Sequence, residues 1–159
     1  MKPKDPYLKQ RLAAVQQSLK KASGWGTGDA QLSAYLAGYL VVLISGVYED
    51  CIEHLVHERA SKSNDVELTS YVDKRIQQTL RNPNRSCVVG LLGEFSAAYK
   101  EQFNVRVASG STDALDSIVS NKNWLAHGET WKLQVTVADV HGYFQRSIPV
   151  LAALEDILK

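Results

Sequence analysis

The sequence has few of the features that would place it in a specialised class of proteins. Among 159 residues there are only two cysteines and no CxxC pair, and the net charge is +1. This balance excludes a global electrostatic attraction to nucleic acid or membranes, so any anion-binding site has to be local. Cys51 and Cys87 lie among apolar residues and are expected to be reduced, buried and structural, as in a cytoplasmic protein.

Segments for export or membrane insertion are also lacking. Residues 1–6 contain two prolines and three charges, and no apolar run follows them. The longest apolar stretch, residues 39–48, is shorter than the roughly 20 residues of a spanning helix and leads into Glu49 and Asp50. The composition is that of one folded domain, residues 1–159, which we expect in the cytoplasm without membrane contact.

Helical periodicity is the main pattern that is present. Apolar residues recur at three- and four-residue steps within roughly 6–22, 30–60, 67–80, 85–105 and 113–127, and again after Thr136. Asp5 and Asp29 are predicted N-caps, and residues 136–139 resemble a capping box. The fold class is therefore all-α, a single-domain helical bundle of five or six helices.

Four sites are predicted to interrupt this pattern. The glycine-rich residues 23–28 and the polar residues 109–112 favour loops. Residues 131–137 alternate between polar and apolar and fit a short strand, although no second strand is evident to pair with it. Pro149 predicts a kink or a new start within the last helix.

The segment with the most chemical content ends the fifth helix. It reads Lys122-Asn123-Trp124-Leu125-Ala126-His127-Gly128. Asn123, Ala126, His127 and Gly128 resemble the R-N-x-x-A-H-G signature of HEPN domains of the RiboL-PSP-HEPN type, with Lys122 at the position of the arginine. A Tyr48-Glu49 pair in the long second helix also fits the layout of the family, which implies a HEPN-like bundle.

The resemblance implies a metal-independent endoribonuclease of toxin or phage-defence type, without a cofactor, whose site is composed across a homodimer. His127 is then the acid/base and Lys122 the phosphate-binding cation. Asn123 is an orienting hydrogen bonder, and Glu49 is a carboxylate that holds an imidazole or an ammonium group. RNA is the expected partner, and an antitoxin or a nucleotidyltransferase is a further candidate.

These residue types suit RNA transesterification. The reaction needs a base for the 2′-hydroxyl proton, an acid for the departing 5′-oxygen and positive charge on the phosphorane. His127 at a helix C-terminus is favoured in its protonated form, which suits a general acid. Lys122 supplies a point charge where arginine would supply a planar fork. Because Lys122 lies about 140° around the helix from His127, convergence requires an uncoiled turn, a long side chain or a second subunit.

Two other interpretations remain open. Lysine at the arginine position is typical of a catalytically degenerate HEPN module that binds RNA or a partner protein without cleavage. The domain is alternatively the subordinate member of a two-component system. His127 before a glycine is also a common helix end, and Glu49, Asp50 and Glu53 also fit the solvated face of an amphipathic helix.

Several other side chains are candidates for contacts rather than for chemistry. Lys74, Arg81 and Arg85, together with Arg75, form a basic group that indicates either RNA backbone contacts or solubility. Trp25 and Trp131 fit base stacking or loop packing. His54 and His57 each follow a carboxylate by four residues, but no third ligand is evident, so no metal site is predicted.

Overall fold

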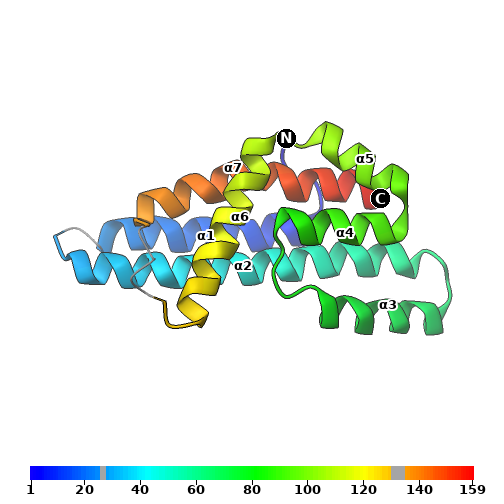
Figure 1. Ribbon diagram of the computed structural model, residues 1–159, viewed down its shortest axis with the longest axis horizontal. Coiled ribbons are helices and arrows are strands. Elements are labelled where there is room, and N and C mark those ends of the chain that lie inside the picture. Colours follow the sequence, from blue (N-terminus) through cyan, green and yellow to red (C-terminus); the bar gives the residue numbers. More distant parts are fainter. Residues whose placement is uncertain (26–27, 130–134) are drawn as a thin grey trace.

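The computed structural model describes residues 1–25, 28–129 and 135–159. Within these ranges there are seven helices and no strand: α1 (Pro6–Trp25), α2 (Ala30–Ser61), α3 (Val66–Thr79), α4 (Arg85–Phe95), α5 (Ala97–Arg106), α6 (Ser109–Ala126) and α7 (Val137–Leu158). Helices α1, α2 and α7 lie along the long axis of the molecule, and α6 crosses them (Figure 1). The all-α class is confirmed, whereas the predicted number of five or six helices was too low.

Helix α2 is the central element, because it contacts α1, α3, α6 and α7. Its side chains are buried at four-residue steps and also on neighbouring faces, as the all-round apolar sequence predicts (Leu40, Val41, Ile44, Tyr48, Cys51, Ile52). Among the described helices, α2 is the one with the length and composition of a membrane span. Buried helices at the centre of a bundle share these properties.

A buried hydrogen bond joins α2 to α7. The Tyr48 hydroxyl donates to Ser147 Oγ at 2.7 Å, and Ser147 Oγ donates to the carbonyl oxygen of Phe144 at 3.0 Å. Burial raises the pKa of Tyr48 well above its usual range. The tyrosine therefore acts here as a neutral donor in the core.

Replacing Tyr48 with phenylalanine is expected to lower the free energy of unfolding by about 1–2 kcal/mol, because the buried Ser147 oxygen loses its donor. Urea denaturation followed by circular dichroism measures the change. Tyr39→Phe is the matched control, since Tyr39 lies on the same helix but is 61% exposed, and it should change stability by less than about 0.5 kcal/mol. Equal stability of the two variants would contradict the buried bond.

The predicted fourth helix, residues 85–105, is in fact two helices. Ser96 lies between them with an extended backbone (φ −168°, ψ 138°), and its side chain accepts a hydrogen bond from the backbone N of Ala98 at 3.2 Å. The break occurs because Ser96 caps a new helix. The apolar spacing continues through Ser96, so the sequence pattern gave no sign of this interruption.

Two predicted loops were partly or wholly wrong. Residues 23–25 continue α1, and residues 109–112 form the first turn of α6 rather than a loop before it. Ala108 precedes α6 without any side-chain cap. In both places polar and glycine residues lie at helix ends, where their low helix propensity costs little.

The last helix is capped as predicted. Thr136 Oγ1 accepts from the backbone N of Asp139 at 3.1 Å, and the Asp139 carboxylate accepts from the backbone N of Thr136 at 2.9 Å. Pro149 lies inside a continuous α7, so no new helix begins there; the buried residues that follow it hold the helix together. The predicted strand at 131–137 falls mainly outside the described residues, and Val137 begins α7.

Candidate functional site

Lys122 projects from α6 into a cluster of three acceptors. Its Nζ lies 3.0 Å from Glu49 Oε1 of α2, 2.7 Å from the backbone oxygen of Arg81 and 3.3 Å from Asn82 Oδ1. An ammonium group has three donors, so the cluster satisfies it fully. The side chains of Lys122 and Glu49 are 23% and 25% exposed. The ion pair is thus shielded on most sides but is open to solvent at its edge.

The turn between α3 and α4 supplies two of these acceptors. It is fixed locally, because the backbone N of Asn84 donates to Asn82 O at 2.7 Å and Asn84 Oδ1 caps α4 through the backbone N of Cys87 at 2.8 Å. Pro83 between them is buried. Lys122 therefore ties an ordered turn to the central helix and is a structural group as well as a candidate functional one.

The three carboxylates of α2 have different surroundings. Glu49 binds Lys122 and also accepts from Ser45 Oγ at 3.3 Å. Asp50 forms its ion pair with Arg11 of α1. Burial raises the pKa of Glu53, and the neighbouring carboxylates of Glu49 and Asp73 raise it further. Of the three candidates, Glu49 is the one that joins the segment with the motif.

His127 ends α6 in a Schellman arrangement. Its backbone N donates to Asn123 O at 3.0 Å, the N of Gly128 to Leu125 O at 3.1 Å, and the N of Glu129 to Trp124 O at 2.8 Å. Gly128 has the positive φ of 71° that this cap requires. The helix end and the glycine cap predicted from the sequence are confirmed, and the His127 side chain is exposed.

The structure does not bring the motif residues together within one chain. Within the described part of the chain, no hydrogen bond or ion pair joins the His127 side chain to Lys122, Asn123 or Glu49. Asn123 meets His127 through its backbone oxygen alone. This arrangement agrees with the angular separation expected from the sequence, since residues five apart lie on different helix faces.

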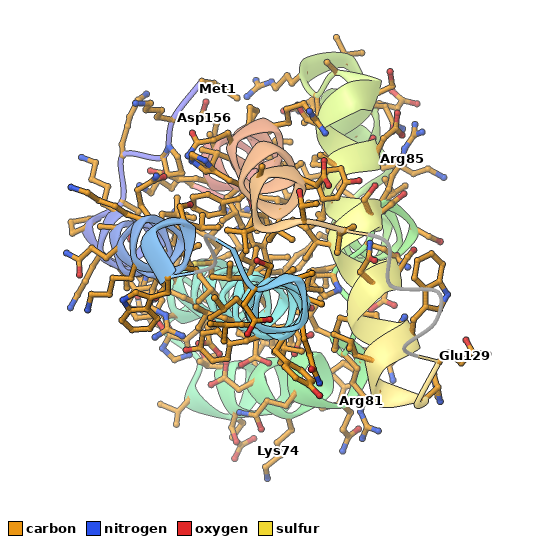
Figure 2. The ribbon with its side chains drawn as sticks, turned by 90° about the vertical axis from the view of Figure 1, so that its left-hand side faces the viewer. Met1, Lys74, Arg81, Arg85, Glu129 and Asp156 are labelled. Atoms are coloured by element: carbon orange, nitrogen blue, oxygen red, sulfur yellow. The ribbon has the colours of Figure 1, made fainter. Side chains whose placement is uncertain are left out.

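The predicted RNA-contacting residues are exposed but do not form one compact patch. Figure 2 shows Lys74 and Arg81 along the edge formed by α3, with Arg85 apart from both. The backbone of Arg85 is held by α6, because its N donates to Asp116 Oδ1 at 2.6 Å. Arg81 contributes its carbonyl to Lys122 while its side chain stays exposed.

Sequence reasoning missed the acceptors in the α3–α4 turn. A backbone carbonyl such as that of Arg81 has no signature in the sequence. Asn82 is a common turn residue, so its place in the turn before α4 already accounts for it without a contact to Lys122. Both cysteines are free, as predicted, but only Cys51 is buried and Cys87 is half-buried. Burial raises the pKa of each thiol, that of Cys51 to about 12. Among the described residues no group of three His, Cys, Asp or Glu could hold a metal ion.

Comparisons with family models, with curated proteins and with solved structures find no match for this chain. Its function therefore has to be inferred from its own residues and from the motif that ends α6.

Proposed function

We propose that this chain is a metal-independent endoribonuclease of HEPN type, active as a homodimer in the cytoplasm. One observation carries the proposal. Lys122 and Glu49, the cation of the motif and the acidic residue after Tyr48, are 73 residues apart in the chain and form a 3.0 Å ion pair. Lys122 lies five residues before His127, whose side chain is exposed. An antitoxin or a nucleotidyltransferase is a suitable partner for its control.

The proposed reaction is an internal transesterification. The ribose 2′-oxygen forms a bond to the adjacent phosphorus and loses its proton to a base, while the bond to the 5′-oxygen breaks and that oxygen takes up a proton. The products are a 2′,3′-cyclic phosphate and a 5′-hydroxyl end. His127 acts as the acid, because its exposed imidazole at the end of α6 can give a proton to the departing 5′-oxygen.

Lys122 binds the phosphate by exchanging an acceptor. The contact with Arg81 O is exposed to solvent, and a phosphate oxygen replaces it while Glu49 holds the ammonium group in place. Because His127 is not joined to this cluster within its own chain, the acid comes from the second copy.

An exposed apolar stripe on α2 supports the homodimer. Leu32, Tyr35, Tyr39 and Val42 are 41%, 68%, 61% and 50% exposed and follow one another at three- and four-residue steps, which places them on one helix face. The same spacing continues through Gly46 to Glu49. A contiguous apolar surface that leads to the ion pair is suited to an isologous contact between two copies.

Replacing Tyr39 with glutamate is expected to convert the dimer into a monomer, because it places charge in the middle of the apolar stripe. Light scattering at micromolar concentration measures the mass, and the cleavage rate should fall with it. Val105→Glu is the matched control, since Val105 is 87% exposed on α5, outside the stripe. A fully active monomeric wild type would contradict the composite site.

A binding module that does not cleave RNA is the second candidate function. The observation in its favour is that all three donors of Lys122 already have protein acceptors, and that lysine replaces the arginine of the motif. In that case Lys122 only holds the α3–α4 turn, and RNA or a protein partner binds without a chemical step.

A single-ribonucleotide substrate separates the two candidates. A DNA oligonucleotide that contains one ribonucleotide should be cut only on the 3′ side of that ribonucleotide, with a cyclic phosphate at the new end. A 2′-O-methyl group at the same position should block the cut, because it removes the attacking oxygen. Cleavage of the methylated substrate would exclude transesterification, and the absence of any cut would favour the binding module.

A further inference from the structure

A groove lies between α3 and α4. The backbone of α3 packs closely against α2 but against no other described helix, so its other side is left open toward α4. Two cavities of about 330 and 420 Å³ occupy this space, and they share Ile76, Thr79, Leu91 and Glu94 as lining residues. The two cavities therefore adjoin each other, and together we call them the α3–α4 groove.

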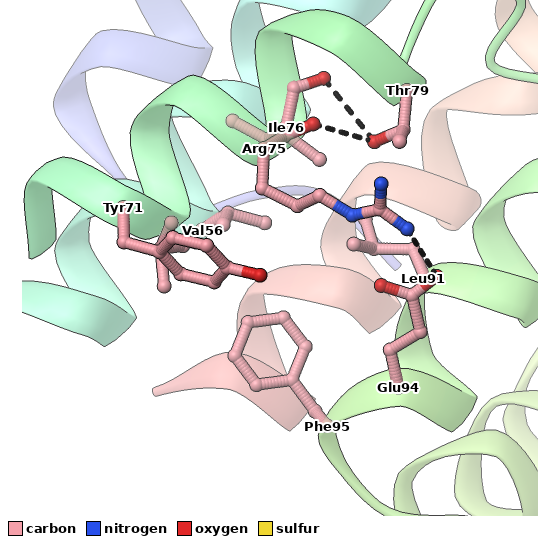
Figure 3. A pocket seen from close by; sticks show the side chains of 9 residues that line it. Val56, Tyr71, Arg75, Ile76, Thr79, Leu91, Glu94 and Phe95 are labelled. Carbon is pink, nitrogen blue, oxygen red and sulfur yellow. Dashed lines mark hydrogen bonds and ion pairs between the residues drawn. The ribbon is translucent and has the colours of Figure 1, made fainter. Parts of the chain in front are cut away.

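The outer end of the groove is aromatic. Tyr71 and Phe95 line it, and they are 67% and 36% exposed, while Val56 of α2 forms part of its floor. Figure 3 shows both rings beside the cavity, with the side chains of Arg75 and Glu94 meeting next to them. Two accessible aromatic rings around an apolar floor offer a stacking surface for a flat ligand.

The inner end of the groove reaches the Lys122 cluster. Arg81 and Asn82 line the groove there, and the same two residues provide acceptors to Lys122 Nζ. From Tyr71 to Thr79 the groove follows α3 for about 12 Å at 1.5 Å per residue. At about 3.4 Å per stacked nucleotide, this length corresponds to three or four nucleotides of a single strand.

Arg75 and Glu94 place two opposite charges at the wall. Their closest nitrogen and oxygen atoms are 4.0 Å apart, and their side chains are 53% and 60% exposed. Such an exposed, long ion pair stabilises the fold by about 0–1 kcal/mol at most, so a ligand can replace either partner at little cost. The guanidinium then suits a phosphate, and the carboxylate suits the amino group of a base.

We propose that the α3–α4 groove binds the single-stranded RNA that flanks the scissile phosphate, with one guanine stacked on Tyr71 and Phe95. The carboxylate of Glu94 accepts from the two adjacent N–H donors of the guanine edge, and Arg75 and Arg81 contact the flanking phosphates. Uracil offers one donor between two carbonyl oxygens and is disfavoured opposite a carboxylate. This inference rests on the proposed ribonuclease function.

Charge and position favour RNA over an apolar partner helix in this groove. A helix that buried its apolar face here would leave Arg75 and Arg81 desolvated unless it supplied matching carboxylates. A nucleic acid strand supplies a phosphate for each arginine and a base for the aromatic end. It also continues directly into the site where Lys122 is proposed to bind phosphate.

Binding to RNA that cannot be cut tests the groove independently of catalysis. Fluorescein-labelled 2′-O-methyl oligonucleotides, one containing guanine and the other with uracil in its place, are titrated with the full chain in EDTA and followed by anisotropy. Tyr71→Ala and Phe95→Ala should each weaken binding about 10-fold, within the range for loss of one stacked base. Val105→Ala is the control, because Val105 is 87% exposed on α5, outside the groove, and Tyr71→Phe should retain binding.

Glu94→Gln tests the specificity. It keeps the size of the side chain but adds an amide donor, so the preference for guanine over uracil, expected to be about 10-fold in the wild type, should largely disappear. Undiminished binding by both alanine variants, or no binding by the wild type, would contradict RNA binding in the α3–α4 groove. If Tyr71→Ala and Phe95→Ala weaken binding but the wild type does not cleave ordinary RNA, RNA binding in the groove would be supported and the proposed ribonuclease function would be contradicted.

Discussion

Alanine at position 127 is expected to lower the rate of RNA cleavage at saturating substrate by about 10²- to 10⁴-fold, the usual contribution of a general acid. The His127 side chain is exposed and its helix cap is made by backbone groups, so the fold should not change. Single-turnover cleavage of a labelled RNA measures the rate, and circular dichroism checks the fold. His141→Ala is the control, because His141 lies on α7 and meets Gln16.

Mixing two inactive variants tests whether the site is shared between copies. In a dimer of one His127→Ala chain and one Lys122→Ala chain, one site carries both substitutions and the other carries neither. An equimolar mixture that exchanges subunits should therefore recover about a quarter of the wild-type activity, given two sites related by a twofold axis. No recovery would place both residues in one chain, and His127→Ala with full activity would remove this residue from the mechanism.

Lys122→Ala is expected to reduce both stability and activity. It leaves the half-buried Glu49 without its cation, and it removes a donor from Arg81 O and Asn82 Oδ1. We expect the free energy of unfolding to fall by about 2 kcal/mol, less than for a fully buried pair because both side chains keep some contact with solvent. Urea denaturation measures the loss, and Lys20→Ala, an exposed lysine on α1, is the control.

A double-mutant cycle with Glu49→Gln isolates the ion pair. The two substitutions should be coupled by about 1 kcal/mol, as expected for residues in direct contact. Additive effects would mean that the pair at 3.0 Å contributes no stability of its own.

The elements that sequence patterns predict well are those with local causes. Asp5, Asp29 and Thr136 cap their helices as expected, and Gly128 takes the left-handed conformation that its place after His127 indicates. These features depend on a few neighbouring residues, so a single sequence contains the information. The angular separation of Lys122 from His127 is equally local and was correctly expected to keep them apart.

The features that were missed depend on contacts between distant segments. The break at Ser96 lies within an unbroken apolar pattern, and α6 starts at Ser109, three residues before the last predicted loop residue, because packing outweighs the weak helix propensity of 109–112. The partners of Lys122 come from α2 and from the α3–α4 turn. A resemblance to a motif suggests Glu49, but a backbone carbonyl such as that of Arg81 is found only in the folded chain.

Cleavage of a mixed-sequence RNA by the purified protein in EDTA, with His127→Ala and Lys122→Arg beside the wild type, tests the central claim most directly. We predict cleavage by the wild type that EDTA does not reduce, cleavage by His127→Ala that is slower by about 10²-fold or more, and faster cleavage by Lys122→Arg, because arginine offers two parallel donors to the phosphate. Activity that EDTA abolishes, or that is undiminished in His127→Ala, would contradict a metal-independent ribonuclease centred on this histidine.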